Sequence, residues 1–428
     1  MTTHEEQGGA GRLYRRYVLA ALLAVYTLNY LDRQFLAVLA EPVKVSLHLT
    51  DTELGALTGP LFALFYTVIG VPIGLLADRT NRVRIIVVAC SIWSLFTGAC
   101  GLASGFLTLA LPRMGVGFGE AGGSPPAYSI LSDYFPPRER GAALAVYSLG
   151  VPFGTMLGAM SGGLLAHLFG WRVAFEALGA LGLLVAPVFW LTVREPPRGR
   201  LDPAAVERDD NLFAGVILFF RRPLLAMTAL ASGVSAFAGY GALIWTPALL
   251  MRDKHMTLPQ VSLYYAAMAG LTGALGTLAS GWLVDKLGRR RASAYGFVPA
   301  AAYFVSLPFL ALGVLSPTWP IALAFLAGPA LLNNMFLPPF LAVVQNATPP
   351  RQRVVAGALL LFVMNLIGLG GGPFFVGFMS DRFKPLVGAA KGLEYGLLCL
   401  APFFLLAVVC DLIVGWLAAR EAALEGAA

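Results

Sequence analysis

The stretch from Gly74 to Arg84 reads GLLADRTNRVR, and the stretch from Gly281 to Arg291 reads GWLVDKLGRRR. The two begin 207 residues apart, and each closes the second long apolar run of its half of the chain. A glycine, an aspartate four positions later and a cluster of basic residues recur in both. This repetition predicts that the chain contains two copies of one structural unit.

Two further motifs recur in the same order. Pro125–Pro126 returns as Pro338–Pro339, and PPRER, which begins at Pro136, returns as PPRQR, which begins at Pro349. Both of these pairs are 213 residues apart, so an insertion of six residues separates their register from that of the first pair. A parallel duplication of this kind is typical of alternating-access transporters, because two similar halves can rock about a shared site.

The composition indicates which medium the two copies occupy. Of the 428 residues, 58% are hydrophobic and 12% are charged, whereas soluble domains have about 45–50% apolar and about 25% charged residues. The net charge of +7 comes mainly from arginines in short segments between apolar runs, which argues against nucleic-acid binding. The chain is therefore predicted to be an all-α integral membrane protein.

Twelve apolar runs are long enough to be membrane-spanning helices, six in each half. If the N-terminus is cytoplasmic, the inner loops contain 21 lysines and arginines and the outer loops contain 7. By the positive-inside rule this bias predicts a multi-pass protein with both termini in the cytoplasm, in the inner membrane if the source is bacterial. The predicted spans are residues 17–40, 52–77, 83–104, 106–133, 140–168, 171–193, 223–251, 258–284, 292–315, 317–345, 353–380 and 393–419.

One long polar segment divides the twelve spans into six and six. It predicts an N-terminal six-helix bundle at 1–193, a cytoplasmic linker at 194–222 and a C-terminal six-helix bundle at 223–428. Within the linker, Asn211 to Phe220 is apolar but too short to cross a membrane, and two arginines follow it. Such a segment is predicted to be a helix that lies in the membrane interface.

The repeated pattern resembles the hallmark loop between the second and third helices of the major facilitator superfamily. The resemblance covers nearly the whole chain and implies two pseudo-symmetric bundles of six helices. It also implies that Asp78 and Asp285 act as a gate latch, which caps a helix end in one transport state and releases it in the other. In the first copy Asn81 stands where the family usually has glycine. The matching residues are Gly74, Asp78, Arg79 and Arg82 in the first copy, and Gly281, Asp285, Lys286, Gly288 and Arg289 in the second.

Within this superfamily, the first and fourth helices resemble the spinster branch. The matching stretches are NYLDRQ (29–34), RMGVGFGEAG (113–122) and SDYFPPRERG (132–141). The first of them alone is also close to a motif of organic-anion symporters in the same superfamily. The resemblance to spinster proteins implies export of lysolipids or sphingoid-type lipids.

A small set of ionisable residues lies deep in the predicted spans. A rise of about 1.5 Å per residue places Asp32 about 12 Å and Arg113 roughly 10 Å below the same membrane edge, which predicts that they pair. Glu120 lies about two turns deeper than Arg113 on the same helix face. Arg33 points about 100° away from Asp32 and is free to pair with another helix. The set is Asp32, Arg33, Arg113 and Glu120, with Asp411 and Glu176 as secondary cases.

These charges suggest proton coupling. A charge at the bilayer centre costs at least a few kcal/mol, so such residues are normally paired or functional. A carboxyl group in an apolar cavity holds a proton more readily, and a nearby cation favours its ionised form. Our hypothesis is that Asp32 is the main proton carrier, that Glu120 is a second carboxylate coupled to protons or substrate, and that Arg113 tunes both. The alternative is a fixed buried ion pair between Asp32 and Arg113.

The second half lacks these charges, because the offset of 213 maps Arg113 onto Leu326 and Glu120 onto Asn333. It offers aromatic and amide side chains, which suit an amphipathic substrate with its head at the charged half and its tail at the aromatic half. Ordinary helix packing is the alternative explanation for each aromatic residue. The predicted substrate-binding residues are Asn29, Arg113, Glu120, Tyr240, Trp245, Tyr264, Asn333, Asn334, Phe336 and Asn365.

Other functional classes lack their motifs. The sequence has no G-x₄-G-K-[ST], H-E-x-x-H or G-x-S-x-G, and its four histidines fall in the tail or in outer loops, so no ATP-driven step, metal site or hydrolase is expected. The predicted function is non-enzymatic, proton-coupled export or exchange of a lysophospholipid or sphingoid lipid by a monomer, with no cofactor beyond the proton gradient. Two alternatives stay open: a proton-coupled symporter of small organic anions, in which Arg113 clamps a carboxylate, and a substrate sensor on a transporter scaffold.

Overall fold

The computed structural model describes residues 3–198, 201, 212–288, 291–349 and 352–426, and every regular element in these ranges is helical. Nine helical stretches within them are long and apolar enough to cross a membrane. The first and fourth predicted spans are not among the nine, because their ionisable residues lower their mean hydropathy, and Val355–Leu424 contains the last two predicted spans together. Each of the twelve predicted spans corresponds to helical structure, which confirms the predicted fold class.

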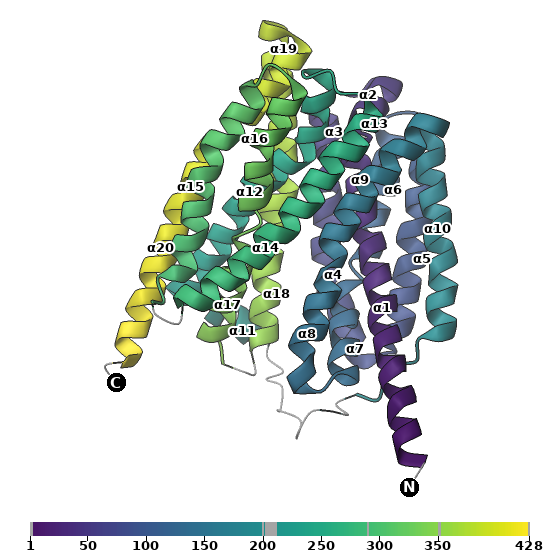
Figure 1. The fold of residues 1–428 in the computed structure, drawn as a ribbon, viewed down its shortest axis with the longest axis vertical. Coiled ribbons are helices and arrows are strands. Elements are labelled where there is room, and N and C mark those ends of the chain that lie inside the picture. Colours follow the sequence, from purple (N-terminus) through teal and green to yellow (C-terminus); the bar gives the residue numbers. More distant parts are fainter. Residues whose placement is uncertain (1–2, 199–200, 202–211, 289–290, 350–351, 427–428) are drawn as a thin grey trace. The chain divides into compact units, whose positions relative to one another are not determined.

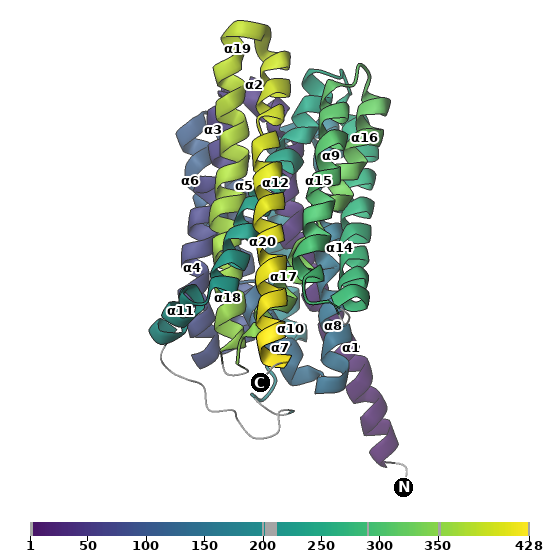
Figure 2. The ribbon, with the colours of Figure 1, turned by 90° about the vertical axis from the view of Figure 1, so that its left-hand side faces the viewer.

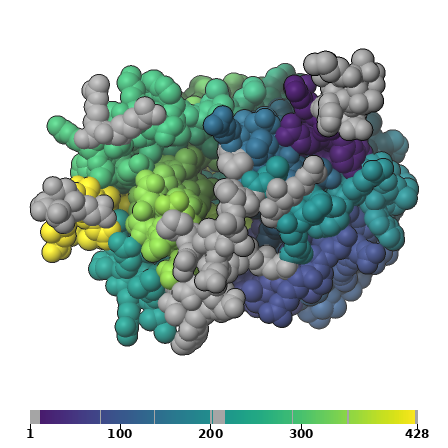
Figure 3. Space-filling view, turned by 90° about the horizontal axis from the view of Figure 1, so that it is seen from below, coloured from purple at the N-terminus to yellow at the C-terminus, as the bar shows by residue number. Residues whose placement is uncertain are grey.

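The chain forms two compact units, which Figures 1 and 2 show as ribbons. Unit 1 comprises Met1–Leu39 and Leu64–Ala205, and unit 2 comprises Ala40–Ala63 and Val206–Ala428. The helices of unit 1 are α1 (Thr3–Val38), most of α4 (Pro60–Arg79), α5 (Arg82–Cys100), α6 (Phe106–Glu120), α7 (Ser124–Tyr134), α8 (Pro137–Ser148), α9 (Gly150–Phe169) and α10 (Trp171–Thr192). Seen from below, the part of α1 that is coloured purple in Figure 3 lies at the surface of this unit.

Glycines determine how α6 packs in unit 1. A Cβ atom at Gly119 would lie 2.6 Å from the Trp93 backbone nitrogen, and one at Gly122, just beyond α6, would lie 2.6 Å from Ala89 Cβ. Both partners belong to α5, so the glycine side of α6 is pressed against α5. Small residues permit this close approach of membrane helices. The packing leaves Arg113 and Glu120 directed to other neighbours.

Unit 2 contains the helices of the second half and two short helices from the first. They are α2 (Ala40–Leu47), α3 (Asp51–Thr58), α11 (Leu212–Arg221), α12 (Pro223–Arg252), α13 (Leu258–Gln260), the π-helical η1 (Val261–Tyr265), α14 (Ala266–Gly288), α15 (Ala294–Leu315), α16 (Trp319–Leu332), α17 (Leu337–Ala347), α18 (Arg353–Met364), the π-helical η2 (Asn365–Leu369), α19 (Gly370–Leu398) and α20 (Ala401–Gly426). Figure 2 shows α20 running alongside α12, and the two helices are in contact.

Residues 40–63 pack with the second half although they follow α1 in the chain. A Cβ atom at Gly55 would lie 2.6 Å from the Pro373 carbonyl oxygen, and one at Gly59 would lie 2.9 Å from that of Gly370. These contacts bring α3 against α19 backbone to backbone. The units that the contacts define therefore do not follow the predicted bundle at 1–193, and their second boundary, between Ala205 and Val206, falls inside the predicted linker.

The helix ends also differ from the predicted spans. The span at 353–380 extends through α19 to Leu398, with a break at Gly388, whose φ of 83° is one that glycine adopts without strain. The predicted interfacial segment forms a helix, α11, of which Ile217, Leu218 and Phe220 are exposed. Residue 211, the first of that predicted segment, lies outside the described residues.

Candidate functional site

An ion pair joins α1 to α6 inside unit 1. Arg113 Nη1 lies 3.3 Å from Asp32 Oδ1, and both side chains are 2% exposed. The hydroxyl of Thr97, on α5, donates a hydrogen bond to the other oxygen of Asp32. The structure therefore contains the pair that the depths of the two residues predicted, with Thr97 as a partner that the sequence did not indicate.

A second ion pair joins the same two helices. Arg33 Nε donates to Glu120 Oε2 at 2.7 Å, and the Glu120 side chain is fully buried. The central guanidinium carbon of Arg33 lies 4.8 Å from the ring centre of Tyr30 and 4.4 Å from that of Tyr66, which are cation–π contacts. Arg33, for which the sequence analysis allows a partner on another helix, thus pairs with Glu120, and the tuning of both carboxylates by Arg113 stays a prediction.

The two pairs form one network of four charges with no net charge. Asp32 and Arg33 are consecutive on α1, and their partners Arg113 and Glu120 are seven residues apart on α6. Long arginine side chains span this difference in height. Protonation of either carboxyl group would weaken its hold on one guanidinium and leave the network with a positive charge. The arrangement can therefore exchange a proton for another charged group.

One atom of the network is open to a further partner. Glu120 Oε1 is buried and has no hydrogen-bond partner among the described residues. Leaving a buried polar atom unsatisfied costs about 1–3 kcal/mol. This oxygen is therefore suited to accept a proton, a water molecule or a cationic group of a substrate.

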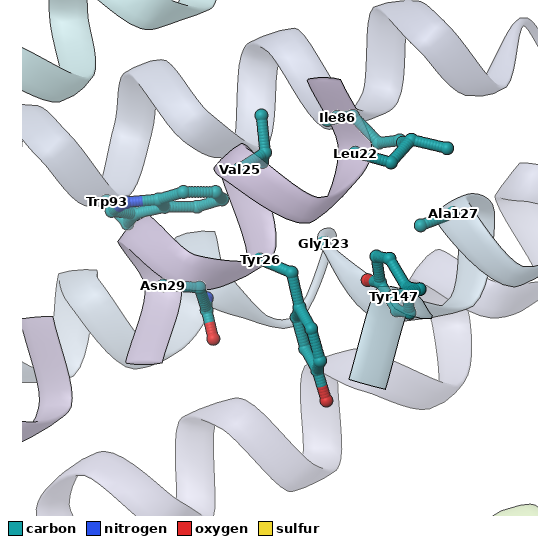
Figure 4. A pocket seen from close by; sticks show the side chains of 9 residues that line it. All are labelled: Leu22, Val25, Tyr26, Asn29, Ile86, Trp93, Gly123, Ala127 and Tyr147. Carbon is teal, nitrogen blue, oxygen red and sulfur yellow. The ribbon is translucent and has the colours of Figure 1, made fainter. Parts of the chain in front are cut away.

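A small pocket in unit 1 contains the predicted residue Asn29. Figure 4 shows Asn29 and Tyr26 from α1, Trp93 from α5 and Tyr147 from α8 around the space beside Gly123. A Cβ atom at Gly123 would lie 4.0 Å from the Asn29 amide nitrogen and 3.9 Å from the Trp93 ring. The space admits about one water-sized group, so it can hold a solvent molecule beside α1 but not a lipid head group.

In unit 2, two predicted substrate residues belong to a buried cluster around Tyr303. Asn333 Oδ1 accepts a hydrogen bond from Ser306 Oγ at 2.9 Å, and the Tyr303 hydroxyl donates to the Ser235 carbonyl oxygen at 2.7 Å. The ring of Phe336 packs edge-on against Tyr303, with ring centres 6.3 Å apart. Sequence reasoning missed Tyr303, because a tyrosine in an apolar run has no pattern of its own.

Two predicted aromatic residues have other neighbours. Trp245 is 1% exposed, and its Nε1 donates to the Pro373 carbonyl oxygen at 2.8 Å, which ties α12 to α19. Tyr264 is 46% exposed and stacks on Trp319 with ring centres 5.4 Å apart. These contacts give Trp245 a packing position and put Tyr264 on the surface of unit 2.

Two of the other predicted residues of unit 2, Asn334 and Asn365, donate hydrogen bonds to backbone carbonyl oxygens one helical turn earlier. Asn334 is exposed and donates to the Ala330 carbonyl oxygen at 2.8 Å. Asn365 begins η2 and donates to the Leu361 carbonyl oxygen at 2.9 Å. Tyr240 is half-buried on α12.

The predicted latch residue Arg82 lies at the start of α5 and is 1% exposed. It forms ion pairs with Asp133 at 2.5 Å and Glu195 at 2.6 Å. It also donates to Ser129 Oγ at 2.8 Å and to the Pro196 carbonyl oxygen at 2.9 Å. Arg82 therefore fastens the end of α7 and the beginning of the linker to α5 within unit 1.

The other predicted latch residues are exposed or have open surroundings. Arg79 is exposed at the end of α4, and no atom lies within 4 Å of a Cβ atom built at Gly74. Asp285 and Lys286 are exposed near the end of α14, where Lys286 Nζ lies 4.8 Å from the ring centre of Trp282. The latch function stays a prediction. The side chain of Asp78 and the whole of Arg289 lie outside the described residues.

A second charged cluster, which the sequence analysis missed, joins α2 and α3 to α12 and α19 within unit 2. The fully buried Asp51 accepts from Arg252 Nη1 at 2.8 Å, from Lys44 Nζ at 2.5 Å and from Ser380 Oγ at 2.7 Å. Arg252 Nη2 also lies 2.7 Å from Glu41 Oε2. The basic members were counted only as outer-loop charges, which indicated no pairing.

Asp381 of α19 completes this attachment by accepting hydrogen bonds at the start of α3. Its carboxylate accepts from the backbone nitrogens of Asp51 at 3.2 Å and Thr52 at 2.7 Å, and from Thr52 Oγ1 at 2.7 Å. The sequence Gly377–x₃–Asp381–Arg382 repeats the spacing of the two loops, in which a glycine is followed by an aspartate and then a basic residue. This third occurrence is the sequence signal that could have identified Asp381 as a functional residue. The aspartate at this position does cap a helix end, as the resemblance implies for the other two.

Comparison with known proteins identifies the class. A family model of the major facilitator superfamily matches residues 22–373, and the chain belongs to this superfamily of transporters. A bacterial homolog of the human lysosomal transporter Spinster, solved in an inward-facing and unoccupied conformation, is 31% identical and superposes with a TM-score of 0.87 over 95% of this chain and 98% of that one. The predicted resemblance to the spinster branch is confirmed.

Two relatives have names that state other functions. An MFS-type efflux pump of Mycolicibacterium smegmatis is 32% identical over 98% of this chain and 96% of the pump. A hexuronate transporter of Bacillus subtilis is 26% identical over 87% of this chain and 89% of the transporter. The chain is therefore a spinster-like membrane transporter.

Proposed function

We propose that this transporter exports an amphipathic lipid of the lysophospholipid or sphingoid type in exchange for protons. The observation that carries the proposal is the neutral network in which Asp32 pairs with Arg113 and Glu120 pairs with Arg33. The similarity to a solved spinster homolog supports the spinster branch, for which the sequence resemblance implies a lipid substrate. Asp32 is the main proton carrier, and Glu120 is the carboxylate that meets the substrate.

The direction of coupling follows from which member of an ion pair contacts the substrate. Lysophospholipids with an amine head group and sphingoid lipids carry a cationic nitrogen, and Glu120 Oε1 is the acceptor without a described partner. A cationic head that binds Glu120 adds positive charge to the network that contains Asp32 and so favours release of the proton from Asp32, and a proton on Asp32 disfavours binding of the head in the same way. Competition of this kind produces exchange. Tyr30 and Tyr66, beside Arg33, add aromatic faces near the same carboxylate.

The test is flux into proteoliposomes with an imposed pH difference. With the wild-type chain, labelled lysophosphatidylethanolamine should move in the direction opposite to the protons. The variant Asp32→Asn should abolish the dependence of this lipid flux on pH. Glu176→Gln removes an exposed carboxylate at the start of α10 and is the matched control, which should behave as wild type. Unchanged pH-driven flux in a folded Asp32→Asn variant would contradict the proposal.

A symporter of small organic anions is the second candidate, favoured by the similarity to a hexuronate transporter. An anion would bind Arg113 or Arg33, and it would bind best when the paired carboxyl group is protonated, so substrate and proton would move together. Hexuronate uptake in the same direction as the protons, with no flux of long-chain lysolipid, would support the symporter and contradict the lipid exporter. A substrate sensor on the same scaffold would bind either ligand and move neither.

We also propose that the protein acts as a monomer with both termini in the cytoplasm, in the inner membrane of a bacterial source. The excess of basic residues in the predicted inner loops supports this orientation. Fusion of green fluorescent protein or alkaline phosphatase to the C-terminus tests it. We expect the green fluorescent protein fusion to be fluorescent and the alkaline phosphatase fusion to be inactive. The opposite result would show that the C-terminus lies outside the cytoplasm.

A further inference from the structure

A pocket in unit 2 combines two polar groups and a cation with an apolar wall, apart from the charged network of unit 1. It lies between α11, the start of α12 and the turn that joins α17 to α18, and its empty volume is about 280 Å³, part of it open to the surroundings. Its enclosed space admits about one water-sized group, so a single ligand atom can enter and the rest of a ligand stays outside. The lining residues used below are Arg222, Thr348 and Gln352, with Leu218, Phe219 and Val355 as apolar neighbours.

Thr348 provides an unsatisfied group inside this pocket. The residue is 5% exposed, and its Oγ1 is buried with no hydrogen-bond partner among the described residues. A buried hydroxyl is normally hydrogen-bonded, so this one is suited to a ligand atom. No side chain caps the first turn of α18, whose N-terminal residues Gln352, Val355 and Ala356 line the same pocket. Helix N-termini of this kind attract anions.

The charges around the pocket also favour an anion. Arg222 donates to the Ala347 carbonyl oxygen and lies 3.3 Å from Glu421 Oε2, and its side chain is 35% exposed. Arg353 Nε donates to the Thr348 carbonyl oxygen at 3.1 Å and is exposed. Two guanidinium groups against one carboxylate leave one positive charge at the rim of the pocket.

The duplication supplies an internal control. Thr348 lies 213 residues after Phe135, and Arg140 Nε donates to the Phe135 carbonyl oxygen at 3.0 Å as Arg353 does to that of Thr348. In the first copy the phenylalanine ring occupies this position and is 7% exposed. The local backbone contact is thus kept in both copies, but only the second copy presents a hydroxyl there.

The first copy has its carboxylate at a different position. Glu139 is the counterpart of Gln352, and it lies 3.6 Å from Arg15, which precedes Arg222 by 207 residues. In the second copy the acidic residue is a neutral amide. Each copy therefore has two arginines and one carboxylate around this position, and the Thr348 hydroxyl is the difference that makes the second pocket more favourable to a negatively charged oxygen.

We propose that this pocket binds the phosphate group of an anionic phospholipid. One phosphate oxygen accepts from Thr348 Oγ1 at the inner end, and the rest of the group lies at the mouth beside Arg222. The exposed apolar residues of α11, Ile217, Leu218 and Phe220, indicate that the phosphate belongs to a lipid, because an amphipathic helix of this kind lies among acyl chains. The proposal is independent of the transported substrate.

The experiment measures binding to the full chain in neutral detergent. Unfolding temperature and bound lipid, detected by native mass spectrometry, are followed with dioleoylphosphatidylglycerol, with dioleoylphosphatidylcholine and with inorganic phosphate. We expect phosphatidylglycerol to bind at least about fivefold more tightly than phosphatidylcholine, since one unpaired cation near the surface is worth about 1 kcal/mol. Inorganic phosphate should give no stabilisation at the same concentration.

Two variants test the pocket itself. Thr348→Val keeps the side-chain shape and should weaken phosphatidylglycerol binding by about 3- to 10-fold, and Gln352→Glu, which restores the acidic residue of the first copy, should weaken it at least as much. Arg221→Gln removes a neighbouring charge outside the pocket and measures non-specific attraction. Equal binding of the two lipids, or wild-type binding by both pocket variants, would overturn the proposal. If inorganic phosphate stabilised the protein as strongly as phosphatidylglycerol does, the conclusion that the bound phosphate belongs to a lipid would be overturned.

Discussion

Asp32 and Arg33 occupy consecutive positions on α1 yet bind residues seven positions apart on α6. The sequence predicted the first of these pairs, because the depths of Asp32 and Arg113 could be counted from the helix ends. The second pair required knowledge of which face of α6 is pressed against α5, and that depends on contacts such as Gly119 against Trp93. Depth along a helix can be read from the sequence, but rotation about its axis is determined by packing.

At the residue scale, we predict that Arg33→Ala destabilises the protein in a pH-dependent way. Removal of one partner of a buried ion pair costs about 3–5 kcal/mol, because the remaining charge is uncompensated. Glu120 bears that charge only when ionised, so the loss of stability should be largest at alkaline pH and should shrink as the pH falls. Thermal unfolding of the purified variant between pH 5 and 9 measures it.

The double variant Arg33→Ala/Glu120→Gln is the control for this prediction. It removes both charges, so its stability should change less with pH than that of Arg33→Ala, and it should be more stable than the single variant at alkaline pH. A single variant whose loss of stability is the same at every pH would show that Glu120 is not the group left uncompensated.

The helices could be predicted from the sequence, because a long apolar run bounded by charges can form few other structures in a membrane. The interruptions of these helices could not be predicted. The turn between α16 and α17, the π-helical η2 and the break at Gly388 all fall inside or beside predicted spans. The association of α3 with α19 was also unpredictable, since it depends on backbone contacts at Gly55 and Gly59 that no periodicity indicates.

At the element scale, we predict that Asp381→Ala loosens α3. The variant removes three hydrogen bonds at the start of this helix, and loss of a helix cap costs about 0.5–2 kcal/mol. Amide hydrogen exchange of residues 51–55 should therefore accelerate by roughly 2- to 30-fold. Lys384→Gln, which changes an exposed residue of the same helix, should leave the exchange unchanged. Equal exchange in both variants would mean that the cap does not hold α3.

At the scale of the whole molecule, the two copies share a scaffold but differ in their charges. The four-charge network lies entirely in unit 1. The buried carboxylate of Asp411, in unit 2, has Ser235 Oγ at 3.5 Å as its one hydrogen-bond partner among the described residues, and its Oδ2 has none. A buried carboxylate without a cation is costly, so Asp411 is expected to keep its proton.

The prediction that belongs to this scale is that Asp411→Asn transports with the same pH dependence as the wild type, because an amide replaces a neutral acid. Asp32→Asn should lose the pH dependence under the same conditions. Proteoliposome flux at several values of the imposed pH difference compares the two. Loss of pH dependence in Asp411→Asn would place a proton-coupling group in the second copy.

Helix α4 has one further consequence, because it starts in unit 2 at Pro60 and continues in unit 1 from Leu64. A continuous helix that belongs to both units is an elastic connection between them, so a change in one unit is transmitted to the other as bending strain. Pro72, which lies in the part of α4 that belongs to unit 1, lacks one backbone hydrogen bond, so the rod yields with least resistance within unit 1 and not at the junction of the units. The stiffness of this rod would then help to set the speed of each turnover.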